Sequence, residues 1–214
     1  MAQQHAGLVI VGRMGAGKDY VVDRITAAIA QAHHAVSWHL GEHYYAMLGK
    51  RLHLSTGEIR RRKPEFRRAL QTIGNDPFAQ REAVRDTLER WEATSGIPVV
   101  IARRQEETEP LRAAGAAVLF IDADEETRRH RVLERDGAEP TLEMLNDASE
   151  PSIEAIRPDL VLDNGLGAGP LHVRFDRPGL QLVNGKCAVL VDLGLAIERI
   201  ERQYRSLIVS GPAL

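Results

Sequence analysis

A glycine-rich segment near the amino end carries the clearest chemistry in the sequence. It consists of Gly12, Arg13, Met14, Gly15, Ala16, Gly17 and Lys18. Glycines allow a loop to curl round an anion with its backbone N–H groups pointing inward, and a helix that starts at the end of the loop adds positive potential. A lysine at the last position of such a loop reaches the β- and γ-phosphates of a nucleotide. This glycine-rich loop therefore predicts a phosphate site, with ATP as the expected nucleotide.

The two residues after the glycine-rich loop bear on how a metal ion is held. The usual motif has Ser or Thr where this chain has Asp19. Because Mg²⁺ favours oxygen ligands, we expect the carboxylate of Asp19 to hold Mg²⁺ directly or through a water. The alternative role is structural, since a carboxylate in the first helical turn is favoured by the helix dipole. Tyr20 is a poor substitute for a compact hydroxyl ligand, and we expect it only to border the nucleotide.

Apolar runs alternate with helical patterns along the first 165 residues. The runs, each bounded by turn residues, predict strands at 8–11, 35–40, 98–102, 116–121 and 160–162. Helical spacing begins after Lys18, and Asp76 and Asp124 each precede a helical pattern in the manner of N-cap residues. Strands that are apolar on both faces and alternate with helices predict a parallel sheet with helices on both sides, which is the α/β class.

The alternation ends near Asn164, where a glycine-rich stretch predicts a linker. A two-strand pattern over 171–191 and a helical pattern over 193–207 follow it. We therefore expect residues 1–165 to form the main domain and residues 166–214 to form a small C-terminal appendage of a β-hairpin and a helix.

Composition excludes several classes of protein. With 43% hydrophobic and 27% charged residues, the 214-residue chain is typical of a soluble globular protein. Its 28 basic and 30 acidic residues give a formal charge of −2, which argues against general nucleic-acid binding. No apolar run approaches the ~20 residues of a membrane span, and the amino end lacks the pattern of a signal peptide. We expect a cytoplasmic protein, in the host cytoplasm if the chain is encoded by a phage.

The glycine-rich loop followed by aspartate, G-x-x-x-x-G-K-D, resembles the form found in phage-type deoxynucleoside monophosphate kinases. Residues 63–74 resemble the K-x-x-x-R-x-x-L-Q-x-x-G segment of that family, and residues 103–107 resemble its R-x-x-x-E segment. Residues 128–135 are similar to its arginine-rich lid helix, and residues 149–164 to its closing segment. The resemblance covers about residues 8–165.

The resemblance implies the three-layer sandwich of P-loop NTPases, with a five-stranded parallel sheet of strand order 2-3-1-4-5. It also implies an acceptor-binding region at about 41–95 and a lid at about 124–146. A homodimer is implied as well, and an apolar stripe in the tail helix is expected either to form its interface or to dock on its own domain.

The residues expected to bind the acceptor are Lys63, Arg67, Gln71, Arg103 and Glu107. Arg67 and Gln71 lie one helical turn apart on one face, so they can hold a monophosphate and its base respectively. Arg103 follows a central strand, where α/β sheets bind ligands, and Glu107 is expected to orient it or to contact the acceptor sugar. The alternative for these charges is a solvated helix face.

The expected catalytic residues are Lys18, Arg128, Arg131 and Arg135. The three arginines recur at helical spacing, so they share a face that can close over a triphosphate and exclude water. Without the glycine-rich loop, the same pattern would indicate only an exposed charged helix. Asn164, at the end of the last parallel strand, is expected to contact the adenine or its loop.

One departure from the family concerns the metal. The family usually has an aspartate two residues before the arginine that corresponds to Arg103, and this chain has Ile101 there, followed by Ala102. Asp19 or Asp122 is expected to compensate. The sequence thus predicts transfer of a phosphoryl group from ATP, with Mg²⁺, to a (deoxy)nucleoside monophosphate. The alternatives are a modified nucleotide in DNA or a small phosphorylated metabolite as acceptor, and a nucleotide-binding module without catalysis.

Overall fold

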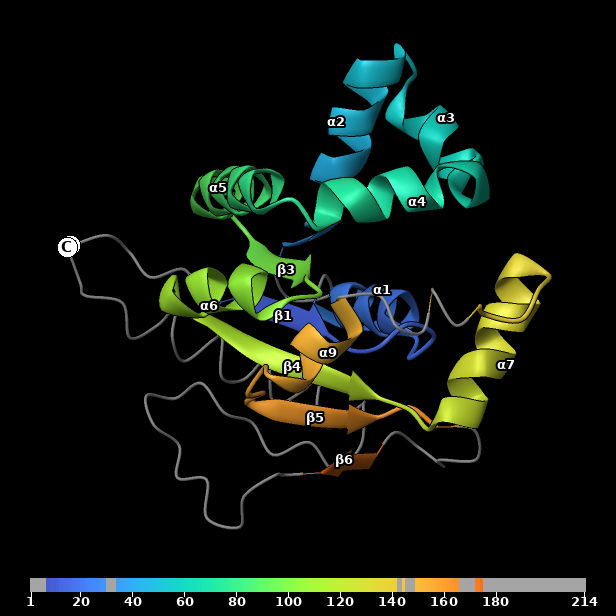
Figure 1. Cartoon of the computed structure of the whole chain (residues 1–214). Helices are drawn as coiled ribbons and strands as arrows, with labels where there is room; N and C mark the ends of the chain where they lie inside the picture. Colours follow the sequence, from blue (N-terminus) through green and yellow to red (C-terminus); the bar gives the residue numbers. More distant parts are fainter. Residues whose placement is uncertain (1–6, 30–33, 142–143, 145–148, 166–171, 175–214) are drawn as a thin grey trace.

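The computed structural model describes residues 7–29, 34–141, 144, 149–165 and 172–174 (Figure 1). The strands are β1 (Gly7–Val11), β2 (Ala35–His39), β3 (Ile97–Ile101), β4 (Ala116–Asp122), β5 (Leu160–Asp163) and β6 (His172–Arg174). The helices are α1 (Lys18–Ile29), α2 (Glu42–Leu52), α3 (Thr56–Arg61), α4 (Lys63–Gly74), α5 (Pro77–Ala93), α6 (Gln105–Ala113), α7 (Glu125–Asp136) and α9 (Ser149–Glu154).

The strands form one sheet in the order β2-β3-β1-β4-β5-β6. The first five are parallel, so the predicted order 2-3-1-4-5 and the α/β class are confirmed. β6 pairs antiparallel with β5 and extends the sheet by one strand. It is the part of the predicted C-terminal appendage that the structure describes. The remainder of that appendage, with the tail helix and Cys187, lies outside the described residues.

Alternate residues of the central strands face two separate hydrophobic clusters. Ile10 of β1 belongs to the cluster that contains Val22 of α1. Its neighbour Val9 belongs to the cluster that contains Trp91 of α5 and Leu111 of α6. Because side chains alternate across a strand, both faces of β1 are buried, which explains why its sequence is a continuous apolar run. The sheet is therefore the middle layer of a three-layer sandwich.

Helix starts follow the capping chemistry expected from the sequence. The carboxylate of Asp76 accepts a hydrogen bond from the backbone N–H of Phe78 at 2.9 Å, at the start of α5. The carboxylate of Asp124 accepts one from the N–H of Thr127 at 2.7 Å, at the start of α7. Each cap satisfies a backbone donor that the helix itself leaves without a partner.

Two groups of helices lie near the carboxyl ends of the strands. α2, α3 and α4 are grouped on the side of the sheet that α5 covers, and α7 stands beyond the carboxyl ends of β4 and β5 (Figure 1). The first group shares a small core with the start of α5, formed by Leu48, Ile59, Ile73 and Ala79. α2, α3 and α4 lie within the range predicted to bind the acceptor, and α7 lies within the range predicted to form the lid. Both roles stay predictions.

Among the described helices, none combines the length and the apolar character that crossing a membrane requires.

Two aromatic residues of α5 provide a test of the core. Trp91 is 1% exposed and Phe78 is 58% exposed. Trp91→Ala should lower the free energy of unfolding by about 3–5 kcal/mol, because it leaves a cavity between α5 and the sheet. Phe78→Ala, the matched control, should change it by no more than about 0.5 kcal/mol. Urea denaturation measures both, and equal losses in the two variants would contradict the packing described here.

Candidate functional site

The glycine-rich loop is packed directly against α7 and the end of β5. Gly15 has a φ of 79°, and a Cβ there would lie 2.4 Å from the carbonyl oxygen of Arg128. Gly17 has a φ of 86°, and a Cβ there would lie 2.4 Å from Nδ2 of Asn164. Both positions require glycine for two reasons, since the backbone is left-handed and a neighbour occupies the space of a side chain. The loop conformation therefore also fixes where α7 begins.

Lys18, the first residue of α1, extends back over the loop. Its Nζ donates hydrogen bonds to the carbonyl oxygens of Gly12, at 2.5 Å, and Arg13, at 2.9 Å. The guanidinium of Arg13 is in turn paired with the carboxylate of Glu154 in α9. The ammonium of Lys18 thus lies at the loop beside the start of α1, where the helix dipole also favours an anion.

The asparagine and the central arginine predicted for the nucleotide side both contact the loop. Nδ2 of Asn164, a buried side chain, donates to the carbonyl oxygen of Ala16 at 2.8 Å. Nη1 of Arg131 donates to the same oxygen at 3.4 Å. The structure therefore brings Lys18, Arg131 and Asn164 together round one loop, although they are far apart in the sequence.

The three arginines predicted to share a face of the lid helix have different surroundings. Arg128 is buried, at 8% exposure, and its Nε donates to the carbonyl oxygen of Ala123 at 3.2 Å. Arg131 contacts the loop, as described above, and Arg135 at the far end of α7 pairs with Asp136. Arg128 is therefore placed to support the start of α7, whereas Arg131 and Arg135 are less buried. The catalytic role of the three arginines stays a prediction.

Asp19 is an ionised carboxylate next to the loop. Its Oδ1 lies 3.1 Å from Nε2 of His39, the last residue of β2. The hydrogen bond with His39 is the main cause that lowers the pKa of Asp19 to about 2, and the charges of Lys18 and Arg103 act in the same direction. No spacing in the sequence indicates this pair, because only the folded sheet brings the end of β2 beside α1.

The residues near Asp19 fit a magnesium ion that is held mainly by phosphates. The side chain of Asp19 is 75% exposed, so its ionised oxygens can reach a ligand. Ile101 is a core residue at 3% exposure and supplies no carboxylate. Within the described part of the chain, no group of three or more His, Cys, Asp or Glu residues could enclose a metal. Mg²⁺ commonly binds through one or two carboxylates and the substrate phosphates, which suits this arrangement.

A group of four basic residues, here called the cationic cluster, lies between α4, the end of β3 and α7. It consists of Lys63, Arg67, Arg103 and Arg135. Burial, followed by the charges of Arg103, Arg135 and Arg67, lowers the pKa of Lys63 to about 8. The same three arginines act on the neighbouring hydroxyl of Tyr45. Like charges gathered in this way favour an anion, and Asp136 already offsets part of their charge through its pairs with Arg67 and Arg135.

Glu107 is buried, and it contacts the backbone of Arg103, a member of the cationic cluster. Its Oε2 accepts a hydrogen bond from the backbone N–H of Arg103 at 2.7 Å, and its Oε1 accepts one from the hydroxyl of Tyr44 at 2.9 Å. Burial raises the pKa of Glu107, and burial and the nearby carboxyl group raise that of Tyr44. Of the two roles that the sequence left open for Glu107, these contacts support the orientation of Arg103.

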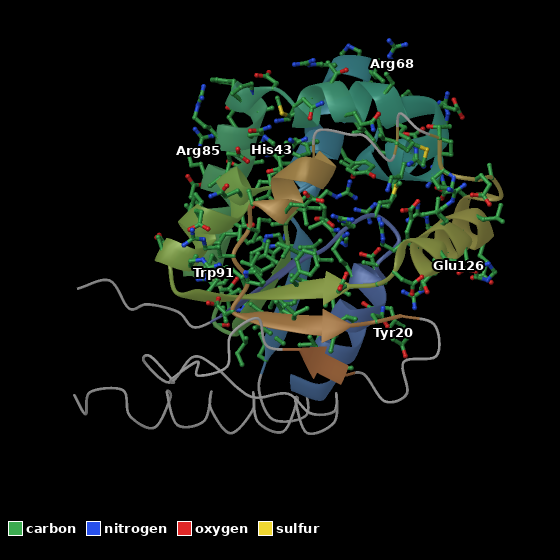
Figure 2. All side chains as sticks on the ribbon, turned by 60° about the horizontal axis from the view of Figure 1, so that its bottom comes forward. Tyr20, His43, Arg68, Arg85, Trp91 and Glu126 are labelled. Carbon is green, nitrogen blue, oxygen red and sulfur yellow. The ribbon has the colours of Figure 1, made fainter. Side chains whose placement is uncertain are left out.

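For the remaining predicted residues, Gln71 and Tyr20, the structure gives a place on a helix and a degree of exposure. Gln71 is half-buried on α4, one turn after Arg67. Tyr20 is 51% exposed, and Figure 2 shows it at the outer side of α1. Arg68, next to Arg67 in the sequence, is exposed and lies on the outer surface of the molecule (Figure 2). Contacts of Gln71 and Tyr20 with ligands therefore stay predictions.

Comparison with known proteins gives only distant similarity. No protein family model and no curated protein matches the sequence. The crystal structure of a gluconokinase from Sinorhizobium meliloti 1021 is 14% identical with a TM-score of 0.47, and the match covers 94% of this chain and 93% of that one. The unliganded crystal structure of a sugar kinase from Janibacter sp. HTCC2649 is 16% identical with a TM-score of 0.47, covering 97% and 96%. At these values the similarity says nothing about a substrate.

The depressed pKa of Lys63 gives a direct test of the cationic cluster. Arg103→Ala should raise the pKa of Lys63 from about 8 towards its ordinary value of 10.5, because one repelling charge is removed. Arg68→Ala, which removes an arginine from the outer surface of α4, should leave it unchanged. NMR titration of the lysine side chain measures both variants. An equal response in the two would show that the cluster does not exist as described.

The same shift has a consequence for stability. Because the folded pKa of Lys63 lies below its unfolded value, the unfolded chain binds more protons between about pH 8 and 10.5. The charged Lys63 therefore opposes folding below pH 8, and this opposition is relieved as the pH rises through that window.

Proposed function

We propose that this protein is an ATP-dependent kinase that transfers the γ-phosphoryl group to a (deoxy)nucleoside monophosphate and forms the diphosphate. The observation that carries the proposal is that two groups of residues suited to anions lie near the carboxyl ends of the parallel strands. One is the glycine-rich loop with Lys18, and the other is the cationic cluster. Phosphoryl transfer needs two phosphate groups held in line with their charge neutralised, and it needs little covalent chemistry from the protein.

On the donor side, the backbone N–H groups of residues 12–18 and the ammonium of Lys18 bind the transferring phosphate. Arg131, which contacts the loop at Ala16, neutralises charge that develops during transfer. Asp19 would be the protein ligand for Mg²⁺, and the metal would supply positive charge that stabilises the phosphates during transfer. Asn164 holds the loop from the other side and borders the nucleotide base.

On the acceptor side, Arg67, Lys63 and Arg103 bind the acceptor phosphate. Arginine offers planar, bidentate hydrogen bonds to phosphate oxygens, and a phosphate dianion matches several cations better than a neutral hydroxyl does. Gln71, one turn along α4, is placed to contact the base. Residues 41–95 would then be the acceptor-binding region and residues 124–146 the lid, as the sequence predicts.

The second candidate is a kinase for a small phosphorylated metabolite. The cationic cluster recognises a phosphate whatever group carries it, so it supports this acceptor as well as a nucleotide, including a modified nucleotide in DNA. The third candidate is a nucleotide-binding module without turnover. The observation that favours it is Ile101, a buried apolar residue where a metal-supporting carboxylate was expected.

An acceptor screen separates these candidates. ADP release is measured with ATP, Mg²⁺ and each nucleoside monophosphate or small phosphomonoester in turn. We expect turnover with one or two deoxynucleoside monophosphates, and a loss of about a hundredfold or more in Lys18→Ala, because the loop then lacks its mobile cation. Lys50→Ala, on the exposed surface of α2, is the matched control and should keep full activity. Tight ATP binding without turnover of any acceptor would contradict the kinase.

Arg67→Ala tests the acceptor site. Losing a charge-assisted hydrogen bond costs about 1.5–3 kcal/mol, so the acceptor KM should rise about tenfold to a hundredfold. The KM for ATP should change less than about twofold, because Arg67 belongs to the other site. Arg68→Ala, its neighbour on the outer surface, should alter neither constant. If the two KM values rise together in Arg67→Ala, the acceptor role of Arg67 is wrong.

A further inference from the structure

One carboxylate connects α7 with α4, the two helices that carry arginines of the proposed site. Asp136 is the last residue of α7, and its Oδ2 accepts hydrogen bonds from Nη2 of Arg135 at 2.8 Å and from Nη2 of Arg67 at 3.0 Å. Its Oδ1 accepts a bond from Nε of Arg135 at 2.7 Å. A single side chain therefore holds an arginine of the lid helix and an arginine of the acceptor region together.

The end of α7 is by itself an unfavourable place for an anion. The helix ends at Gly137, whose φ is 70° and whose N–H donates to the carbonyl oxygen of Leu133 at 2.8 Å. The negative end of the helix dipole lies there and repels a carboxylate. The hydrogen bond from Arg135, with added attraction from Arg67, nevertheless lowers the pKa of Asp136 to about 2. The attraction of the two arginines is therefore stronger than the repulsion from the helix dipole, and Asp136 stays ionised near neutral pH.

The side chains of this ion pair are less exposed than those of the surface pairs of the same helix. The side chains of Arg67 and Asp136 are only 22% and 20% exposed. The pair of Arg129 and Glu125, also on α7, is 47% and 66% exposed, with an N–O distance of 3.9 Å. Exposed pairs contribute little, because water and salt screen them. Arg135 donates two hydrogen bonds to Asp136 and so fixes the orientation of its carboxylate, which accepts one hydrogen bond from Arg67 across the two helices. The contact from Asp136 to α4 can therefore fix the position of a helix.

We propose that Asp136 is a positioning residue, which fixes α7 against α4 and thereby sets the distance between Arg135 and Arg67. The effect of Asp136 on catalysis rests on the proposed function, whereas its effect on the distance between α7 and α4 does not. The hydrogen bond from Arg67 to Asp136 uses one of the five N–H donors of a guanidinium. Arg67 can therefore keep this bond while it binds an acceptor phosphate, and lid closure is then coupled to the acceptor site.

The opposite role for the same contact is that of a placeholder. In that case the carboxylate of Asp136 occupies the position of the acceptor phosphate and has to leave before the acceptor binds. The two roles predict opposite effects of removing the charge. Loss of a positioning residue slows transfer, whereas loss of a placeholder tightens acceptor binding.

The first experiment measures the distance between the helices in the full chain. Spin labels are attached to Arg68→Cys on α4 and Leu133→Cys on α7, both exposed, with Cys187→Ser to remove the native cysteine. Double electron–electron resonance then gives the distribution of distances without any ligand. In Asp136→Asn we expect a longer and broader distribution. Arg67→Gln, which removes the other partner of the contact, should give the same change.

Glu134→Gln is the matched control for this measurement. It removes a carboxylate from the same helix, and that carboxylate pairs with His130 at 3.2 Å and not with α4. Its distribution should equal that of the parent chain. An unchanged distribution in Asp136→Asn would overturn the proposal, whether or not the protein proves to be a kinase.

The second experiment tests whether Asp136 positions the helices or occupies the place of the acceptor phosphate. With the acceptor found in the screen, Asp136→Asn should lower kcat by about tenfold or more, because misplacement of the reacting groups by about 1 Å is enough for such a loss. The acceptor KM should stay the same or rise. A fall in the acceptor KM with an unchanged kcat would show a placeholder and overturn the proposal. If the parent chain transfers phosphate to no acceptor, the proposed function fails, and the distance measurement still decides the role of Asp136.

Discussion

The close contact between the glycine-rich loop and α7 is the constraint on which the rest of the site depends. A Cβ at Gly15 would overlap the carbonyl oxygen of Arg128, and one at Gly17 would overlap the amide of Asn164. Only glycine allows the loop to curl as it does and its neighbours to come this near. Because the loop touches the beginning of α7, the same contact that shapes the phosphate site also determines where Arg131 and Arg135 emerge. The position of the glycine-rich loop and the position of α7 therefore depend on the same contact.

The cationic cluster stores unfavourable energy that the surrounding residues have to offset. Burial is the main cause that lowers the pKa of Lys63, and repulsion by Arg103, Arg135 and Arg67 lowers it further. Glu107 holds the backbone of Arg103 in place, and Asp136 draws Arg67 and Arg135 together. Both acidic residues come from helices that follow a strand of the parallel sheet. The sheet thus supplies the rigid frame that keeps like charges close enough to bind an anion.

Much of the fold could be predicted because local signals agreed with it. The apolar runs became the parallel strands, since both faces of the sheet are covered, and Asp76 and Asp124 cap the helices that they precede. Contacts between distant segments could not be predicted. The pair of Asp19 and His39 exists because β2 lies at one edge of the sheet beside α1, and the sequence does not encode that placement in any spacing.

Helical spacing likewise predicted which arginines share a face, but not how deeply each is buried. Arg128 and Arg131 lie one turn apart, yet Arg128 is enclosed at the start of α7 while Arg131 reaches the loop. Asp136 follows Arg135 directly in the sequence, and its partner Arg67 is 69 residues away. Burial and long-range pairing depend on tertiary packing, and they are what divides a charged helix face into structural and ligand-facing residues.

The charge balance between α4 and α7 bears on how two anions would bind together. Asp19 and Asp136 are ionised, but Lys18, Arg131 and the four members of the cationic cluster leave the region strongly positive. A triphosphate at the loop and a phosphate at the cluster would each remove part of this repulsion. Binding of one anion would therefore favour binding of the other. Asp136 already links α7 to α4 in the structure without a ligand, so the two phosphates would offset the repulsion that remains within an existing arrangement.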